Sequence, residues 1–110
     1  MNANFNTFMG YNAGRSNTVG SENTFVGSNA ANQCINGLKN VVVGNNTGFE
    51  LVSGIENVFV GTQAAANNQT GSENVIIGHD AAQLVSQSDQ NVIIGEEAMA
   101  LRPPLVYQTF

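Results

Sequence analysis

A five-residue motif occurs six times along the chain at a constant spacing of 17 residues, and this spacing constrains the fold more than any other feature. Each copy has Asn at the first position, Thr or Val at the second, apolar residues at the third and fourth, and Gly at the fifth, as in NVFVG at residues 57–61. A short exact repeat is typical of a solenoid, in which each coil packs only on its neighbours. The copies begin at Asn6, Asn23, Asn40, Asn57, Asn74 and Asn91.

The apolar part of the motif is β-branched or aromatic in nearly every copy, which favours an extended backbone. Copies stacked at the spacing of neighbouring strands, about 4.8 Å, form a parallel sheet. The glycine that ends each motif permits a sharp corner, because glycine adopts positive φ without strain. These turn glycines are Gly10, Gly27, Gly44, Gly61, Gly78 and Gly95.

Two further columns repeat within the coils. A small residue follows the turn glycine by three positions, and we expect it to face a narrow interior. A second glycine follows the first by ten positions and is predicted to form the return turn. The small residues are Ala13, Ala30, Thr47, Ala64, Ala81 and Ala98, and the second glycines are Gly20, Gly37, Gly54 and Gly71, with Ser88 in the fifth coil.

The asparagine that opens each motif is predicted to be structural. Identical amides stacked on successive parallel strands form hydrogen bonds along the stack. They also satisfy backbone groups at the corner of the coil. We therefore expect an asparagine ladder at Asn6, Asn23, Asn40, Asn57, Asn74 and Asn91, with no catalytic role.

The repeat divides the chain into three parts. Residues 1–5 form a lead-in, residues 6–100 form the repeat domain, and residues 101–110 form a tail with two prolines. The prolines cannot continue a strand ladder. The tail either caps the open sheet edge at the end of the last coil or docks on another protein. Its candidate docking residues are Pro103, Pro104, Leu105, Val106, Tyr107 and Phe110.

The strands are apolar at three successive positions, which is typical of strands buried on both faces. One face lines the interior of the coil, and the other would expose a stacked apolar column larger than soluble monomers leave bare. We expect a symmetry-related copy to cover it. Core and interface positions are Phe8, Phe25, Val42, Phe59, Ile76 and Ile93, and the flanking Val26, Val43, Val60, Ile77 and Ile94; the sequence leaves open which column is which.

The charge and cysteine content exclude several classes of protein. The net charge is −5, and the only basic residues, Arg15, Lys39 and Arg102, are scattered, which argues against nucleic-acid binding. A single cysteine, Cys34, excludes an intrachain disulfide and a cysteine-based zinc site, and is predicted to be a small buried filler. No apolar run approaches the roughly 18 residues of a membrane span, so no membrane insertion is expected.

The candidate catalytic residues are few. His79 and Asp80 are adjacent, but the other coils have Tyr-Asn, Ser-Asn, Asn-Asn, Thr-Gln or Glu-Glu at the same place, which indicates a variable exposed turn. Glu96 and Glu97 have no histidine beside them and make a poor metal site. We therefore predict no enzyme activity, no catalytic residue, no cofactor and no metal.

Three other classes of protein share some of these features. A hexapeptide-repeat acyltransferase requires an apolar residue at every sixth position, and 17 is not a multiple of six. An ice-binding solenoid requires a rank of threonines, but the second motif position changes from Thr7 and Thr24 to Val in the later coils. A carbohydrate-binding module remains an alternative, although the chain has two tyrosines and no tryptophan for aromatic platforms.

The motif, with its following Ala and later Gly, resembles the head repeats of trimeric autotransporter adhesins. Segments such as NTFMGYNAGRSNTVGSENTFVG are similar to repeats of bacteriophage and viral tail-fibre and spike proteins. The resemblance covers about residues 6–100 and implies an all-β fold, a left-handed parallel β-roll of six 17-residue coils, assembled as a homotrimer. The period is longer than is typical of adhesin heads, and the adhesin stalk and membrane anchor are absent.

These departures favour a virion component over a bacterial adhesin. A chain of 110 residues resembles a small trimeric spike, capsid-decoration (cement) or fibre protein on the particle exterior, without enzyme activity. Capsid or tail proteins are the expected partners, with a host-surface glycan or receptor as a further one. The alternative is the head of a trimeric adhesin, or a glycan-binding module, at the bacterial surface.

Overall fold

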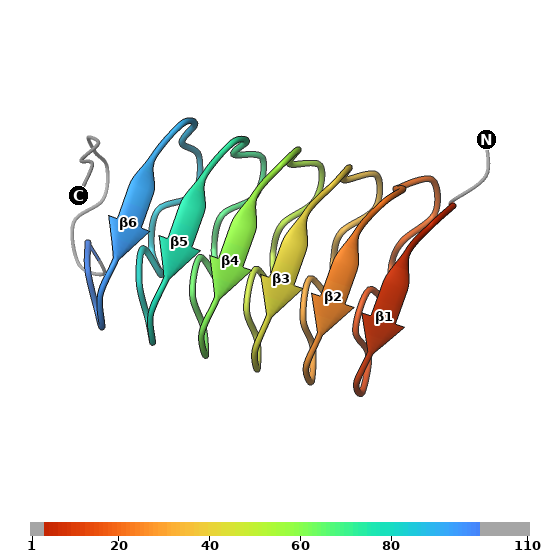
Figure 1. Ribbon diagram of the computed structural model, residues 1–110, viewed down its shortest axis with the longest axis horizontal. Coiled ribbons are helices and arrows are strands. Elements are labelled where there is room, and N and C mark those ends of the chain that lie inside the picture. Colours follow the sequence, from red (N-terminus) through yellow and green to blue (C-terminus); the bar gives the residue numbers. More distant parts are fainter. Residues whose placement is uncertain (1–3, 100–110) are drawn as a thin grey trace.

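The computed structural model describes residues 4–99, which form a β-solenoid of about five turns (Figure 1). Six short parallel strands make one sheet whose order follows the chain, from β1 to β6. The predicted all-β repeat fold with parallel strands is confirmed. The strands are β1 (Thr7–Met9), β2 (Thr24–Val26), β3 (Val41–Val43), β4 (Val58–Val60), β5 (Val75–Ile77) and β6 (Val92–Ile94).

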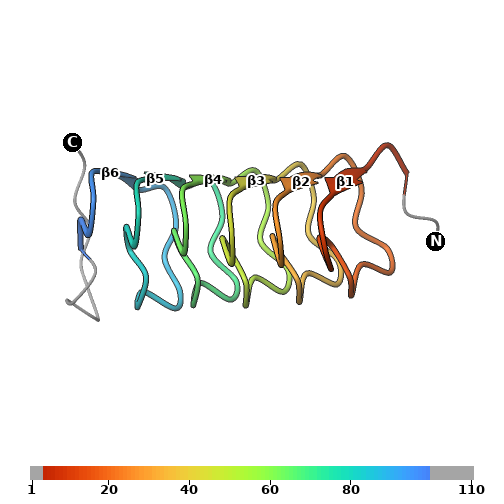
Figure 2. The same cartoon turned by 90° about the horizontal axis from the view of Figure 1, so that it is seen from below.

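Strand pairing follows the sequence repeat without a slip. Phe8 pairs with Phe25, and Val42 pairs with Phe59, each one coil further along the chain. The exact period sets this register, because a shift by one residue would move the apolar residues to the other face of the sheet. The strands lie along one face of an elongated body that measures 36 × 23 × 17 Å (Figures 1 and 2).

The rest of each coil is also bonded to its neighbours through the backbone. On one side of the coil the N–H of Gly48 donates to the Ala64 carbonyl at 2.9 Å. On another side the N–H of Val52 donates to the Gln69 carbonyl at 2.8 Å. Coil-to-coil hydrogen bonds therefore surround the interior, which satisfies the buried backbone of a chain with only three strand residues per coil.

Each coil turns sharply at backbone positions with positive φ. In the fourth coil these are Gly61 (126°), Gln63 (62°), Ala65 (50°) and Glu73 (59°), and equivalent residues of other coils adopt similar values. Only the glycine was predicted from the sequence. A non-glycine residue in this region costs about 1–2 kcal/mol. The repeated coil-to-coil hydrogen bonds hold these residues in place.

The two glycine columns are needed for different reasons. Gly61 combines positive φ with close packing, since a Cβ atom there would lie 2.7 Å from the Gly78 carbonyl oxygen. The second glycine column has no positive φ, contrary to the simple expectation of a glycine-dependent turn. At Gly37 a Cβ atom would instead lie 2.7 Å from Nδ2 of Asn40 and 2.6 Å from Sγ of Cys34. The second glycines make room for the backbone carbonyl of the next coil and for neighbouring asparagine side chains.

The interior is a narrow stack of side chains. The middle residue of each strand from β2 to β6 points inward and is buried, as Phe59 and Ile76 are. Small residues on the opposite wall, such as Ala64 and Ala65, are also fully buried and allow the two walls to approach. None of the described residues belongs to a helix that is long and apolar enough to cross a membrane.

Candidate functional site

The six motif asparagines form a hydrogen-bonded ladder along one corner of the solenoid. Nδ2 of Asn57 donates to the Gly71 carbonyl at 2.7 Å and to Oδ1 of Asn40 at 3.0 Å. Oδ1 of Asn57 accepts from the backbone N–H of Asn74 at 3.0 Å. Each asparagine from Asn23 to Asn74 makes the same two bonds to backbone groups, and the bond between side chains recurs at each asparagine from Asn40 to Asn91.

The burial of the asparagine side chains decides whether a ligand can reach the ladder. The side chains of Asn23, Asn40, Asn57 and Asn74 have no exposed surface. At the ends, Asn6 is half-buried, and Asn91 donates to the Asp89 carbonyl at 3.1 Å. A ligand in solution therefore has no access to the central amides, and their polar atoms are used within the protein.

The strands present a flat apolar surface on their outer side. Because alternate side chains of a strand point in opposite directions, the second and fourth motif residues share this side. We call these residues the strand face; most are half-buried, and Val41 and Ile94 are 37% and 51% exposed. The strand face consists of Thr7, Thr24, Val41, Val58, Val75 and Val92 together with Met9, Val26, Val43, Val60, Ile77 and Ile94.

The two columns that the sequence left undecided therefore have different places. The column Phe25, Val42, Phe59, Ile76 and Ile93 is core, and the column from Val26 to Ile94 is on the strand face. Phe8 is 37% exposed at the N-terminal end, where its ring stacks on Phe25 with centroids 4.9 Å apart. Sequence reasoning missed that the second motif residues belong to the same outer surface, although strict alternation within the strand would have indicated it.

A second apolar patch lies on the other side of the asparagine corner, in the second and third coils. It consists of Ile35, Leu38, Val52 and Ile55. Ile35 and Val52 are joined by a coil-to-coil hydrogen bond of 3.0 Å, and Leu38 pairs with Ile55 in a parallel bridge. Ile35, Leu38 and Ile55 are 37–44% exposed. The first half of the solenoid thus has apolar side chains on both sides of the ladder.

His79, Glu96 and Glu97 lie on exposed corners, whereas the Asp80 side chain is only 20% exposed. Nε2 of His79 is 3.6 Å from Oδ2 of Asp80, and Nδ1 of His79 is 3.7 Å from Oε2 of Glu96. Half of the histidine side chain is exposed. Glu97 is exposed as well. Within residues 4–99 no group of three or more His, Cys, Asp or Glu side chains could hold a metal ion.

Cys34 is fully buried in the interior. Burial raises the pKa of its thiol to about 11, and the hydrogen bond from the Gly37 N–H lowers it by a smaller amount. A thiol held protonated in this way is a poor nucleophile. Its position agrees with the predicted role of a small interior filler.

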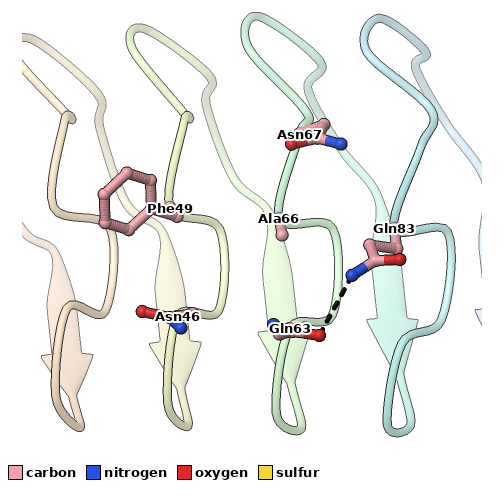
Figure 3. Close-up of a pocket in the computed structure, with 6 residues that line it drawn as sticks. All are labelled: Asn46, Phe49, Gln63, Ala66, Asn67 and Gln83. Carbon is pink, nitrogen blue, oxygen red and sulfur yellow. Dashed lines mark hydrogen bonds between the residues drawn. The ribbon is translucent and has the colours of Figure 1, made fainter.

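A side groove, which sequence reasoning did not find, crosses the third to fifth coils away from the strand face (Figure 3). Its volume is about 340 Å³. One aromatic ring, one alanine and four amide side chains line it. These residues are Asn46, Phe49, Gln63, Ala66, Asn67 and Gln83.

The predicted docking tail, with Pro103, Pro104, Leu105, Val106, Tyr107 and Phe110, lies outside the described residues. The candidate surfaces are therefore the strand face, the second apolar patch and the side groove. None of them contains a nucleophile paired with a base. The chain matches no protein-family model, no curated protein and no solved structure.

Proposed function

We propose that this chain is a non-enzymatic structural protein that assembles as a homotrimer of left-handed coils on the exterior of a virus particle. The observation that carries the proposal is the strand face, an outward surface of two apolar columns that runs the length of the sheet. The apolar side chains recur in coil after coil along one flat sheet, which suits packing against an equally repetitive surface. A second copy of the same rod has the matching length and repeat.

The size of the strand face favours a ring over a twofold dimer. Six strands about 4.8 Å apart, each with three residues of about 3.3 Å, give a flat footprint of roughly 24 × 10 Å, or about 240 Å². A stable interface usually buries about 800 Å² on each partner. A face-to-face dimer of strand faces alone falls well short of that area.

A ring uses a second surface of each protomer. The strand face and the second apolar patch lie on opposite sides of the asparagine ladder, so that Leu38 and Val41 flank Asn40. When the strand face of one copy packs on the apolar patch of the next, the contact is heterologous, and such contacts form a ring when the rotation between copies closes. Three copies, with the ladder corner toward the axis, form the smallest such ring. The resemblance of the repeats to trimeric fibre and adhesin heads agrees with this number.

The proposed role follows from the same features. The rod has a uniform repeat and a buried amide ladder, which suit a stiff spacer or a decoration on a shell. The repeats resemble those of spike and fibre proteins, and a net charge of −5 keeps the surface soluble. Capsid or tail proteins are the proposed partners. The runner-up is the head of a trimeric adhesin at a bacterial surface.

Sedimentation equilibrium of the purified chain tests the assembly. The wild type is expected at three times the monomer mass of 11.6 kDa. Val60→Asp, on the strand face, is expected to sediment as a monomer, whereas Thr62→Asp, at an exposed corner, stays trimeric. A wild-type monomer at micromolar concentration would refute the assembly. Saturable binding to capsids that lack the protein supports decoration, and absence of binding favours the adhesin alternative.

A further inference from the structure

We propose that the side groove binds a neutral saccharide, through stacking on Phe49 and hydrogen bonds to the surrounding amides (Figure 3). The groove lies within one protomer. It goes beyond the structural role proposed above and does not depend on the trimer.

One small residue creates the groove. The tenth position of the first five coils is occupied in turn by Arg15, Asn32, Phe49, Ala66 and Gln83. The exact period stacks these residues in one column, about one strand spacing apart. Ala66 is the smallest member of the column and stands between Phe49 and Gln83, so its short side chain leaves a gap. The repeat tolerates a large residue at this place in the other coils, and the gap is therefore not required by the fold.

The lining has the chemistry that recognises a sugar ring. Phe49 is only half-buried and supplies an apolar ring in a largely polar surface. Nε2 of Gln83 donates to Oε1 of Gln63 at 3.0 Å, which fixes both side chains and leaves Nε2 of Gln63 and Oε1 of Gln83 available. Within residues 4–99 the side-chain amides of Asn46 and Asn67 make no hydrogen bond to the protein.

Amide donors and acceptors beside an aromatic ring suit vicinal hydroxyls on one side of a pyranose and its C–H bonds on the other. The groove lining contains no ionisable side chain, and the protein carries a net charge of −5. A sialylated or phosphorylated ligand would find no cation there. A purely apolar ligand would desolvate the amides of Asn46 and Asn67, and the unused groups of Gln63 and Gln83, without giving them partners, which is unfavourable. A neutral hexose or N-acetylhexosamine needs no cation and supplies hydroxyl groups as partners for the amides.

The groove also stays open in the proposed trimer. Its residues occupy the seventh, tenth and eleventh positions of the coil, whereas the strand face and the second apolar patch use the second, fourth, thirteenth and sixteenth. The saccharide site and the assembly can therefore fail independently. A monomer that binds sugar would refute the trimer alone, and a trimer that binds none would refute the site alone.

Saturation-transfer NMR on the full chain tests the site with methyl glycosides of glucose, galactose, mannose and N-acetylglucosamine, and with the methyl glycoside of N-acetylneuraminic acid as a charged probe. At least one neutral glycoside is expected to bind. Phe49→Ala should weaken that binding by about tenfold or more, equivalent to about 1.4 kcal/mol. Ala66→Arg fills the gap with the side chain found at the same coil position in Arg15, and should abolish binding.

Arg15→Ala is the matched control, since it changes the same column two coils away, and it should bind like the wild type. Circular dichroism and thermal melting establish that each variant is folded. Failure of every neutral glycoside to bind the wild type would overturn the proposal. Binding of the charged glycoside alone, or undiminished binding by folded Ala66→Arg, would overturn it as well.

Discussion

Substitution of one central asparagine of the ladder measures how much the ladder stabilises the solenoid. Asn57 is fully buried, and its amide connects three coils. Asn57→Ala removes the donor to the Gly71 carbonyl and the acceptor of the Asn74 N–H. Oδ1 of Asn40 still accepts from the backbone N–H of residue 57, and Nδ2 of Asn74 still donates to the Ser88 carbonyl.

The expected cost follows from the two backbone groups that lose their side-chain partner. A buried polar group left without a hydrogen bond costs about 1–3 kcal/mol. Two such groups lower the free energy of unfolding by about 2–6 kcal/mol. The whole stability of a typical domain is about 5–15 kcal/mol. A single asparagine thus accounts for a large share of the stability of the rod.

Urea denaturation followed by circular dichroism measures the effect, at one fixed protomer concentration because association contributes to stability. Asn45→Ala is the matched control, since Asn45 is an exposed corner asparagine. That variant should stay within about 0.5 kcal/mol of the wild type. A loss below about 1 kcal/mol for Asn57→Ala would refute the assignment of the ladder as a main source of stability.

Asn57→Asp keeps the size and shape of the side chain and changes its hydrogen-bonding groups. The carboxylate keeps an acceptor for the Asn74 N–H but faces the Gly71 carbonyl with an oxygen instead of a donor. Burial disfavours the charged form, so the pKa of this carboxyl is raised above its unfolded value of about 3.9. The folded state then binds more protons than the unfolded state, and the variant gains stability as the pH falls through the raised pKa. A destabilisation that is independent of pH from 7 to 4 would contradict this explanation.

Three further predictions use the same preparations. Gly54→Ala places a Cβ atom against the Gly71 carbonyl oxygen and 2.5 Å from Nδ2 of Asn57, and should lower the free energy of unfolding by about 1–3 kcal/mol; an unchanged urea midpoint would contradict this close packing. Cys34 should react with thiol reagents only after denaturation, because it is buried. The pKa of the Cys34 thiol is raised from 9.0 to about 11, so the contribution of the thiol to stability is present below pH 9 and is lost as the pH rises toward 11. Cys34→Ala should therefore lose less stability at alkaline pH than the wild type, and an equal loss in both proteins would argue against this linkage. Phe59→Asp should lose the β-sheet circular dichroism signal, whereas Val60→Asp should keep it; equal loss in both would contradict the assignment of one residue to the core and the other to the strand face.

Some features of the fold follow directly from local properties of the chain. The spacing of 17 residues and the β-branched strand residues predicted six parallel strands in register, and each pairing, such as Val58 with Val75, obeys the repeat. The turn glycines were also predictable, because positive φ is a property of a single residue and its neighbours. The other left-handed positions were not, since Glu73 and Ala65 have no intrinsic preference for that region. Hydrogen bonds to adjacent coils impose it.

The sequence alone determined that this protein is a stack of similar coils. An exact period places the same strand and the same corner in every coil, so each coil can repeat the hydrogen bonds of the one before it. The tertiary structure decided which side of the strand is inside, and so separated Phe59 of the core from Val60 of the strand face. It also decided that Gly37 serves the asparagine ladder through its size, and that Ala66 opens a groove beside Phe49. These features depend on the distances between side chains in neighbouring coils. The period tells which residues stack on one another, but it does not give those distances.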